Sequence, residues 1–370
     1  MVIVGISSFA YNSSRKSKSW IRLALLVTVV HLVLLVFIAQ TSSNKTLLVL
    51  GNYYEWFNIG DNSSQSFGSF GTENMQTPSR TSYNSSTRSV SSRTECYNRV
   101  LYNSSEMVCT LRTAALKILD RQTSPFNKLG LSRYLPNGSA FLEMKTYKWC
   151  AVIGSSYFLL GSKLGKEIDS HDAVLRFNDA LVTGFERDVG SKTTIRLINS
   201  QMLVKKKKNA SLLKALNVNS TLFVWKAGGR DENLMKWYTV SKDMFNNYIK
   251  WCIHRPEQCP YVINPSVLWK CWDIIQRYTK ERMKNIVPTT GFTGIHLMHH
   301  ICESIDVYGY VTPTNTNCHY YDVHKCPRLA WHPVEAEKNF LKTLHVGNEN
   351  DLSVKGKLSL YGFHHDCVTC

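Results

Sequence analysis

Short apolar runs that alternate with stretches of helical spacing limit the fold of this chain more than any other feature of its sequence. The runs are rich in β-branched and aromatic residues and comprise Cys150–Gly154, Ala173–Phe177, Thr194–Ile198, Thr221–Trp225 and Val307–Tyr310. Helical spacing is found in Val267–Tyr278 and Thr293–Ser304. Strands that alternate with helices predict an α/β domain, in which helices flank a mostly parallel central sheet. Ligands of such sheets bind at the carboxyl ends of the strands.

One apolar segment, Leu23–Ala39, is long enough to approach the thickness of a membrane. As a helix it would span roughly 26 Å at about 1.5 Å per residue. Basic residues precede it and acidic residues do not, so the positive-inside rule predicts a cytosolic tail at 1–22 and a luminal chain after the segment. An uncleaved transmembrane signal anchor at 23–39 is the favoured interpretation, and a cleaved signal peptide is the alternative.

The chain after the anchor falls into two parts of different composition. Residues 40–95 are rich in Ser, Thr and Asn, which predicts a flexible, disordered luminal stem. Residues 96–370 carry the strand and helix patterns and have the size of a single globular domain. N-glycosylation sequons fit secretory transit, and they lie at Asn44, Asn62, Asn84, Asn103, Asn137, Asn209 and Asn219.

The chain is strongly basic, with 44 Lys+Arg against 27 Asp+Glu and a formal net charge of +17. Most of this charge belongs to the globular part, and the run Lys205–Lys208 is expected to be a solvated loop. A secretory lumen holds no nucleic acid, so anionic sugar nucleotides, acidic glycans or membrane surfaces are better candidate partners. The 11 cysteines favour disulfides, and no zinc-finger spacing or D-x-D motif predicts a metal site.

The block from Cys150 to Gln201 carries the first candidate site. Its first strand runs into a Gly-Ser-Ser turn, where backbone N–H groups can approach a phosphate or a ribose. Asn178 and Asn199 each end a short apolar run, and an amide there can both donate to and accept from a sugar or base. An asparagine that merely sits in a turn is the alternative explanation.

Three further blocks carry candidate chemistry. Pro288–Cys302 begins with two threonines and a glycine before a helix, which suits either an anion site or an ordinary N-cap. His319–Asp322 and Trp331–Lys338 each place a histidine near carboxylates. His332 stands before Pro333 and an acid-rich helix start, so a carboxylate could orient it as a base near pH 7.

These blocks resemble the four sialylmotifs of animal sialyltransferases: the long, the short, the third and the very short H-x4-E, here His332 and Glu337. The sequence TTIRLINSQ that ends the long block is most similar to the β-galactoside α-2,6-sialyltransferases. The resemblance covers roughly residues 105–365 and implies a single Rossmann-like catalytic domain. It also implies an inverting glycosyltransferase that uses CMP-sialic acid as donor and needs neither a metal ion nor a cofactor.

The resemblance assigns roles to individual residues. His332 matches the catalytic base, and His319 would act with it at the leaving phosphate. Residues expected to bind the donor are Ser155, Asn178, Asn199, Thr289, Thr290, Gly291, Cys318, His319, Trp331 and Lys338. Residues expected to contact the acceptor are Gln201, Trp331 and Asp243.

The resemblance also implies disulfides. Cys150 would pair with Cys302, and Cys318 with Cys326. Cys109 matches the partner of a C-terminal cysteine, which we assign to Cys367, with Cys370 as the alternative. From spacing alone, Cys252 and Cys259 can close a local loop, and Cys96 and Cys271 stay unassigned.

The expected reaction is the transfer of sialic acid to the 6-hydroxyl of a terminal galactose or GalNAc on glycoprotein glycans. His319 and Trp331 stand where the α-2,6 branch usually carries Tyr, so transfer in α-2,3 linkage to galactose is the alternative. A non-catalytic luminal glycan-binding protein is a third possibility. The expected setting is a type II protein of the Golgi membrane, held there by its own anchor. Expected partners are CMP-sialic acid, galactose-terminated N-glycans and, as a homodimer, a second copy, but no nucleic acid.

Overall fold

The computed structural model describes residues 102–138, 144–216, 219–311, 319–322 and 332–370. The predicted tail, anchor and stem lie outside these ranges. Within them, no helix has the length and apolar character that a membrane crossing requires.

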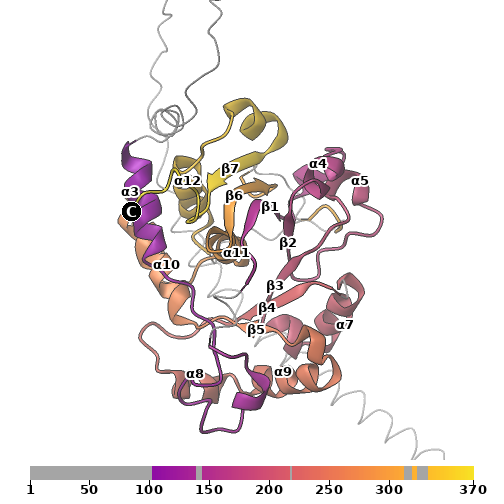
Figure 1. Ribbon diagram of the computed structural model, residues 1–370, viewed down its shortest axis with the longest axis vertical. Helices are drawn as coiled ribbons and strands as arrows, with labels where there is room; N and C mark the ends of the chain where they lie inside the picture. The colour runs from indigo at the N-terminus through magenta and orange to yellow at the C-terminus, as the bar shows by residue number, and fades with distance from the viewer. Residues whose placement is uncertain (1–101, 139–143, 217–218, 312–318, 323–331) are drawn as a thin grey trace, which may run out of the picture. The chain divides into compact units, whose positions relative to one another are not determined.

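A seven-stranded sheet with the order β5-β4-β3-β2-β1-β6-β7 forms the centre of the fold (Figure 1). Strands β1 to β6 pair in parallel, and β7 is antiparallel to β6. The strands are β1 (Tyr147–Ile153), β2 (Ala173–Phe177), β3 (Ile195–Asn199), β4 (Thr221–Trp225), β5 (Tyr261–Val262), β6 (Cys302–Tyr308) and β7 (Lys357–Tyr361). The prediction of a mixed α/β domain with a mostly parallel sheet is therefore confirmed.

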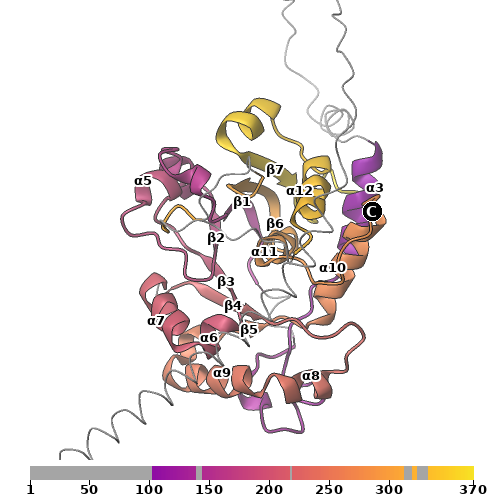
Figure 2. The same ribbon diagram turned by 180° about the vertical axis from the view of Figure 1, so that it is seen from behind.

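Helices cover both faces of this sheet because neighbouring residues of each strand point to opposite sides. On β1, Cys150 and Val152 join one buried cluster, whereas Ala151 and Ile153 join another. Figures 1 and 2 show α7, α8 and α9 grouped near β5, and α12 beside β7 at the other end. The helices are α3 (Tyr102–Arg112), α4 (Gly165–Asp169), α5 (Glu186–Val189), α6 (Gln201–Val204), α7 (Lys206–Ala215), α8 (Leu234–Val240), α9 (Lys242–His254), α10 (Ser266–Arg277), α11 (Thr290–His299) and α12 (Val334–Thr343). Short 3-10 turns lie at Ser132–Tyr134, Tyr157–Leu159 and Pro256–Gln258, and a π-helical turn at Asp351–Lys355.

Two predicted boundaries differ from the structure. The helix expected at Thr293–Ser304 is α11, which starts and ends earlier, so that Cys302 already begins β6. The strand expected at Val307–Tyr310 ends at Tyr308, because Gly309 adopts a left-handed φ of 68° that breaks the extended backbone. The run at Lys205–Lys208 is exposed as predicted, but its last three lysines form the first turn of α7 instead of a loop.

The disulfides confirm one predicted pairing, show one that the sequence only allowed and correct another. Cys150 pairs with Cys302, joining β1 to the start of β6, and Cys252 pairs with Cys259. Cys109 pairs with Cys370 and not with Cys367, because α3 places its Cα 5.4 Å from that of Cys370. Within the described ranges Cys271 is the free cysteine and is buried. The predicted bridge between Cys318 and Cys326 lies outside the described residues.

Strand order places a topological switch between β1 and β6. From β1 the chain proceeds outward through β2, β3, β4 and β5, and then returns to the other side of β1 as β6. In open parallel sheets such a reversal leaves a crevice at the carboxyl ends of the two strands. The ends of β1 and β6 are therefore where a ligand site is expected.

Candidate active site

The carboxyl edge of the sheet brings the predicted polar residues to one side of the molecule. Ser155, Asn178 and Asn199 follow or end β1, β2 and β3, which are parallel neighbours. Tyr310 follows β6 at the same edge. The helix α11 leads directly into β6, so its N-terminus returns to this edge as well.

Asn178 is held in an uncommon conformation. Its φ is 45°, in the left-handed region that asparagine tolerates better than most residues. Its side-chain Oδ1 accepts the N–H of Asn199 at 3.0 Å, and Asn199 Oδ1 in turn accepts the N–H of Gln201 at 3.1 Å. Both side-chain oxygens are thus engaged locally. The amide nitrogens are the groups of these two residues that can donate to a ligand.

Two buried arginines support this edge, and sequence reasoning did not select them. Arg176 and Arg196 are register partners on β2 and β3, and both are almost completely buried. Arg196 donates to the Asn178 carbonyl at 2.9 Å, which fixes the backbone of that residue. Burial lowers the pKa of Arg196 to about 10. A charge inside the apolar runs AVLRF and TIRLI was the sequence signal, since arginine is rarely buried without a partner.

Thr289 caps α11 and links it to a second segment. Its Oγ1 accepts the N–H of Phe292 at 3.1 Å, so the ordinary N-cap interpretation is correct. Its own N–H and hydroxyl donate to Glu337 at 2.8 and 2.6 Å. The first backbone N–H groups of α11 have no partners within the helix and can meet an anion. One residue thus shapes the helix end and holds it in place.

A neighbouring aromatic ring leaves no room for a side chain at Gly291. A Cβ at this position would lie 2.5 Å from Cε2 of Tyr310. The Tyr310 hydroxyl donates to Glu337, in addition to the two donors from Thr289. The glycine therefore admits the tyrosine that completes the Glu337 hydrogen bonds.

Glu337 is fully buried, although it lies in the first turns of α12. Burial raises the pKa of its carboxyl, and the hydrogen bonds from Thr289 and Tyr310 act in the opposite direction. The H-x4-E spacing pointed to this residue, but its contacts are with chain 27 to 48 residues away. These hydrogen bonds hold α12 against the N-terminus of α11.

His332 is joined to the same segment two residues before Thr289. Its Nδ1 lies 2.9 Å from the carbonyl oxygen of Val287, and a carbonyl can only accept, so Nδ1 carries the proton. Nε2 is then the basic nitrogen of the neutral ring. Among the described residues, the hydrogen bond that orients the imidazole is accepted by a backbone carbonyl, whereas the sequence suggested a carboxylate.

His319 is held at the site by contacts with the residues that follow β1. Residues 156 and 319 form an isolated bridge, and the N–H of Tyr320 donates to the Ser155 carbonyl at 3.0 Å. The His319 ring stacks on Tyr321 with centroids 5.1 Å apart. Burial lowers the pKa of His319, against the charges of Asp322 and Asp179. A neutral ring at pH 7 can hydrogen bond a leaving phosphate without a standing charge.

The other predicted residues are less closely connected. Thr290 and Gly291 form the first turn of α11, and Gln201 begins α6 next to Asn199. Lys338 bonds Glu335 on its own helix at 3.3 Å. Asp243 is an exposed residue in the first turn of α9, and no described contact connects it with the rest of the site. Trp331 and Cys318 lie outside the described residues.

The sequons differ in exposure. Asn137 and Asn219 are exposed, whereas Asn209 is half-buried in α7 and donates to the Met202 carbonyl at 3.3 Å. Asn103 belongs to α3. Asn44, Asn62 and Asn84 lie outside the described residues.

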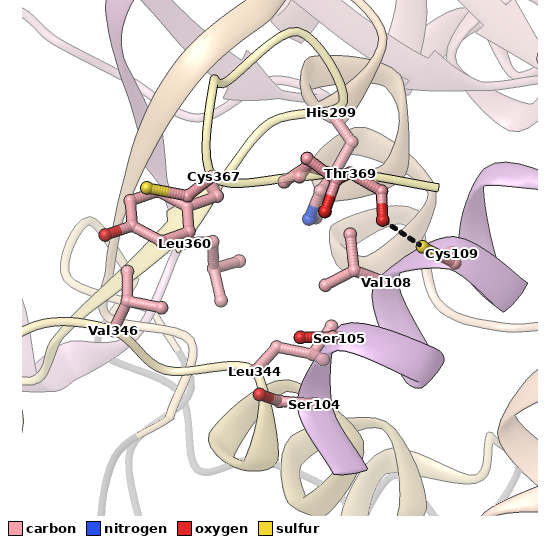
Figure 3. A pocket seen from close by; sticks show the side chains of 12 residues that line it. Ser104, Ser105, Val108, Cys109, His299, Leu344, Val346, Leu360, Cys367 and Thr369 are labelled. Atoms are coloured by element: carbon pink, nitrogen blue, oxygen red, sulfur yellow. Dashed lines mark hydrogen bonds between the residues drawn. The ribbon is translucent and has the colours of Figure 1, made fainter. Parts of the chain in front are cut away.

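Figure 3 shows a pocket that none of these residues lines, between α3, the end of α12, β7 and the last residues of the chain. Mostly apolar side chains line it, with His299 and Ser104 among the polar ones. Its volume of about 20 Å³ is room for one water molecule and not for a sugar ring. It is therefore not a substrate site.

Comparison with known proteins identifies the chain's relatives. The model of glycosyltransferase family 29 (sialyltransferase) matches residues 98–348. Beta-galactoside alpha-2,6-sialyltransferase 2 of Danio rerio is 38% identical over 270 residues, 70% of this chain and 52% of the relative. The Homo sapiens protein of that name is 38% identical over 266 residues, 70% of this chain and 50% of the relative. A solved structure of a mammalian sialyltransferase in complex with Gal-beta-1-3GalNAc-ortho-nitrophenol aligns with a TM-score of 0.41 and 22% identity, covering 66% of this chain and 83% of that one.

The chain spans about half the length of the curated relatives that it matches. The family model, in contrast, covers most of the chain, including every residue predicted to act in catalysis or to bind the donor or acceptor. The match begins just before α3 and ends after α12, so that it contains strands β1 to β6 of the sheet. The chain therefore belongs to glycosyltransferase family 29, the sialyltransferases.

Proposed function

We propose that this protein transfers sialic acid from CMP-sialic acid to the 6-hydroxyl of a terminal galactose or GalNAc on a glycan, with inversion. The observation that carries the proposal is the bond of His332 Nδ1 to the Val287 carbonyl, two residues before the Thr289 turn. This bond supports the proposal because it leaves Nε2 as the nitrogen that could act as a base, near a helix N-terminus of the kind that binds phosphate. The α-2,6 linkage is favoured by the names of the relatives.

In the proposed reaction, Nε2 of His332 takes the proton of the acceptor hydroxyl while its oxygen attacks the anomeric carbon of sialic acid. The bond from that carbon to the CMP phosphate breaks, and CMP leaves with the electron pair. Attack from the face opposite the leaving group converts the β-linked donor into an α-linked product. The base acts on an uncharged hydroxyl, so the neutral form of His332 is the active one.

Charge that develops on the leaving phosphate needs donors that are in place beforehand. In this chain the candidates are the first N–H groups of α11, the Thr290 hydroxyl and His319. Asn178 and Asn199 would hold the nucleotide or sialyl group from the neighbouring strands. No metal ion is part of this scheme, and activity in the presence of EDTA is the corresponding test.

The experiment compares His332→Ala with the unaltered full-length chain in detergent, with EDTA present. Acceptors ending in Gal-β-1,4-GlcNAc, GalNAc-β-1,4-GlcNAc and Gal-β-1,3-GalNAc are supplied separately, and linkage-selective sialidases identify the product. We expect an α-2,6 product and a turnover lowered about 10²–10⁴-fold in the variant, with CMP binding retained. Near-normal turnover in the variant would refute the role of His332. An α-2,3 product would favour the alternative that His319 suggests, and CMP binding without any product would favour a non-catalytic protein.

We further propose that residues 23–39 anchor the protein in the Golgi membrane with residues 96–370 in the lumen, and that 40–95 form the stem. Support comes from the basic residues before the apolar segment and from the sequons after it. Protease protection of the globular part in intact vesicles, together with carbonate-resistant membrane association, tests this arrangement.

A further inference from the structure

A groove of about 260 Å³ lies between α6, α7 and α9, apart from the residues proposed for catalysis. Its walls combine apolar and basic side chains: Val204 and Leu213 with Lys206, Lys250, His254 and Arg255. None of the described residues that line it is acidic. The groove is thus concave, partly apolar and positively charged.

Helix stability does not account for these charges. Lys206, Lys207 and Lys208 fill the first turn of α7, which has no acidic residue and no side-chain N-cap. Cations near a helix N-terminus oppose the helix dipole and each other. The ion pair recorded for this run, between Lys208 and Asp179, is long at 3.8 Å. An anion above this turn would relieve the repulsion.

Side chains of α9 and its C-terminal end form the other wall of the groove. Arg255 lies over the Trp251 ring with its guanidinium carbon 5.7 Å from the centroid, and it also bonds Gln258 at 3.5 Å. Lys250 and His254 are one helical turn apart on α9, and both are exposed. Arg255 is therefore already held in place and loses little side-chain entropy when an anion binds, and the other two groups are accessible to one.

The groove adjoins the proposed site along the chain. The four-residue helix α6 begins at Gln201, a predicted acceptor residue, and ends at Val204 in the groove wall. Lys208 reaches Asp179, which follows Asn178, and its charge acts on His319. A ligand in the groove would therefore lie within a few residues' length of a glycan at the site.

We propose that this groove binds an acidic, partly apolar polypeptide segment of the glycoprotein that carries the acceptor glycan. Its charge calls for an anionic partner, and its apolar walls favour a peptide over a free anionic glycan. Its concave shape excludes a flat membrane surface. The inference deepens the proposed function, since it concerns which glycoproteins the same site serves. A glycan on Asn209, which also lines the groove, would block the segment.

Binding is tested first without catalysis. The full-length chain is titrated against a fluorescein-labelled peptide of alternating Glu and Leu, with a Lys and Leu peptide as the control ligand. Lys206→Glu/Lys250→Glu should weaken binding of the acidic peptide about tenfold, as two screened attractions become repulsions. The matched variant Lys166→Glu/Lys342→Glu changes the net charge equally on α4 and α12, which do not line the groove, and it should bind within twofold of the unaltered chain.

Equal weakening in both variants would reduce the effect to net charge and overturn the proposal. If the groove variant loses binding to a sulfated oligosaccharide or to anionic vesicles but keeps its binding to the peptide, the proposal is overturned in favour of that partner. The second arm measures transfer. The groove variant should raise KM about tenfold for a glycopeptide with an acidic flank and leave kcat/KM for the free disaccharide unchanged. If neither substrate is turned over by any form, the proposed function fails, and the peptide titration still decides the groove.

Discussion

The Glu337→Gln substitution tests whether the proposed base, His332, and the proposed nucleotide-binding turn at Thr289 act as one unit. Glu337 accepts three hydrogen bonds, from the Thr289 N–H, the Thr289 hydroxyl and the Tyr310 hydroxyl. Glutamine keeps the shape but places an NH2 group, which cannot accept, on one side. If its oxygen keeps the N–H, its nitrogen faces two hydroxyl groups that were donors.

The size of the effect follows from these contacts. Two hydrogen bonds to a charged group, each worth about 1.5–3 kcal/mol, are exchanged for at most one neutral bond of about 1 kcal/mol. Removing a buried charge recovers part of the loss. We therefore expect a net destabilisation of about 2 kcal/mol, which for a domain of this size lowers Tm by about 4–8 °C. Turnover should fall about 30-fold if that energy measures the displacement of α11 from α12.

The assay combines thermal unfolding, calorimetric binding of CMP and turnover at saturating donor. Tyr310→Phe is the matched variant, because it removes one donor and leaves the carboxylate, so it should produce about half the loss in Tm and turnover. A purely structural role would lower Tm without changing kcat at 25 °C, where the protein stays folded. Wild-type kcat and Tm in Glu337→Gln would refute the reasoning.

Three further predictions concern other parts of the structure. Gly291→Ala should lower the free energy of unfolding by about 1–3 kcal/mol, because the added Cβ would lie 2.5 Å from the Tyr310 ring. Gly229→Ala should be neutral, because the nearest atom to a Cβ there is 3.5 Å away. Chemical unfolding of the two variants compares these free energies. Burial lowers the pKa of His296 to about 4, so it contributes stability above pH 6.5 that is lost as the pH falls toward 4. The loss is about 1.4 kcal/mol per pH unit, and unfolding of His296→Gln at several pH values should show a correspondingly shallower slope. Peptide mapping of the protein purified from animal cells should find a glycan at exposed Asn137 but none at half-buried Asn209.

The sequence predicted the parallel core of the sheet well, because its strands are buried on both faces and read as continuous apolar runs. It did not reveal β5, which has two residues and depends on its neighbour β4. It also missed the edge strand β7, where buried and half-buried residues alternate. The boundary between α11 and β6 was misplaced because apolar residues lie on both sides of His299 and His300, and no glycine or proline marks the end of the helix.

Candidate site residues could be selected from the sequence by residue type and position, but the contacts between them could not be predicted. Asn178, Asn199 and Thr289 were selected from strand ends and a helix start, which local sequence encodes. The hydrogen bonds of Glu337 come from Tyr310 and Thr289, which the fold brings to it from other segments of the chain. No pattern within α12 could show that its glutamate would be fully buried.

The disulfides that join two described cysteines are nested, and this has a consequence for biosynthesis. The bond between Cys252 and Cys259 lies inside the interval from Cys150 to Cys302, which lies inside that from Cys109 to Cys370. In the proposed luminal arrangement the chain would be translocated from its N-terminal side, so Cys109 and Cys150 would be available to each other before either native partner had been made. A bridge formed between them at that stage would be non-native. Correct maturation therefore depends on thiol–disulfide exchange after synthesis, and cells with little isomerase activity should accumulate misbridged, inactive protein.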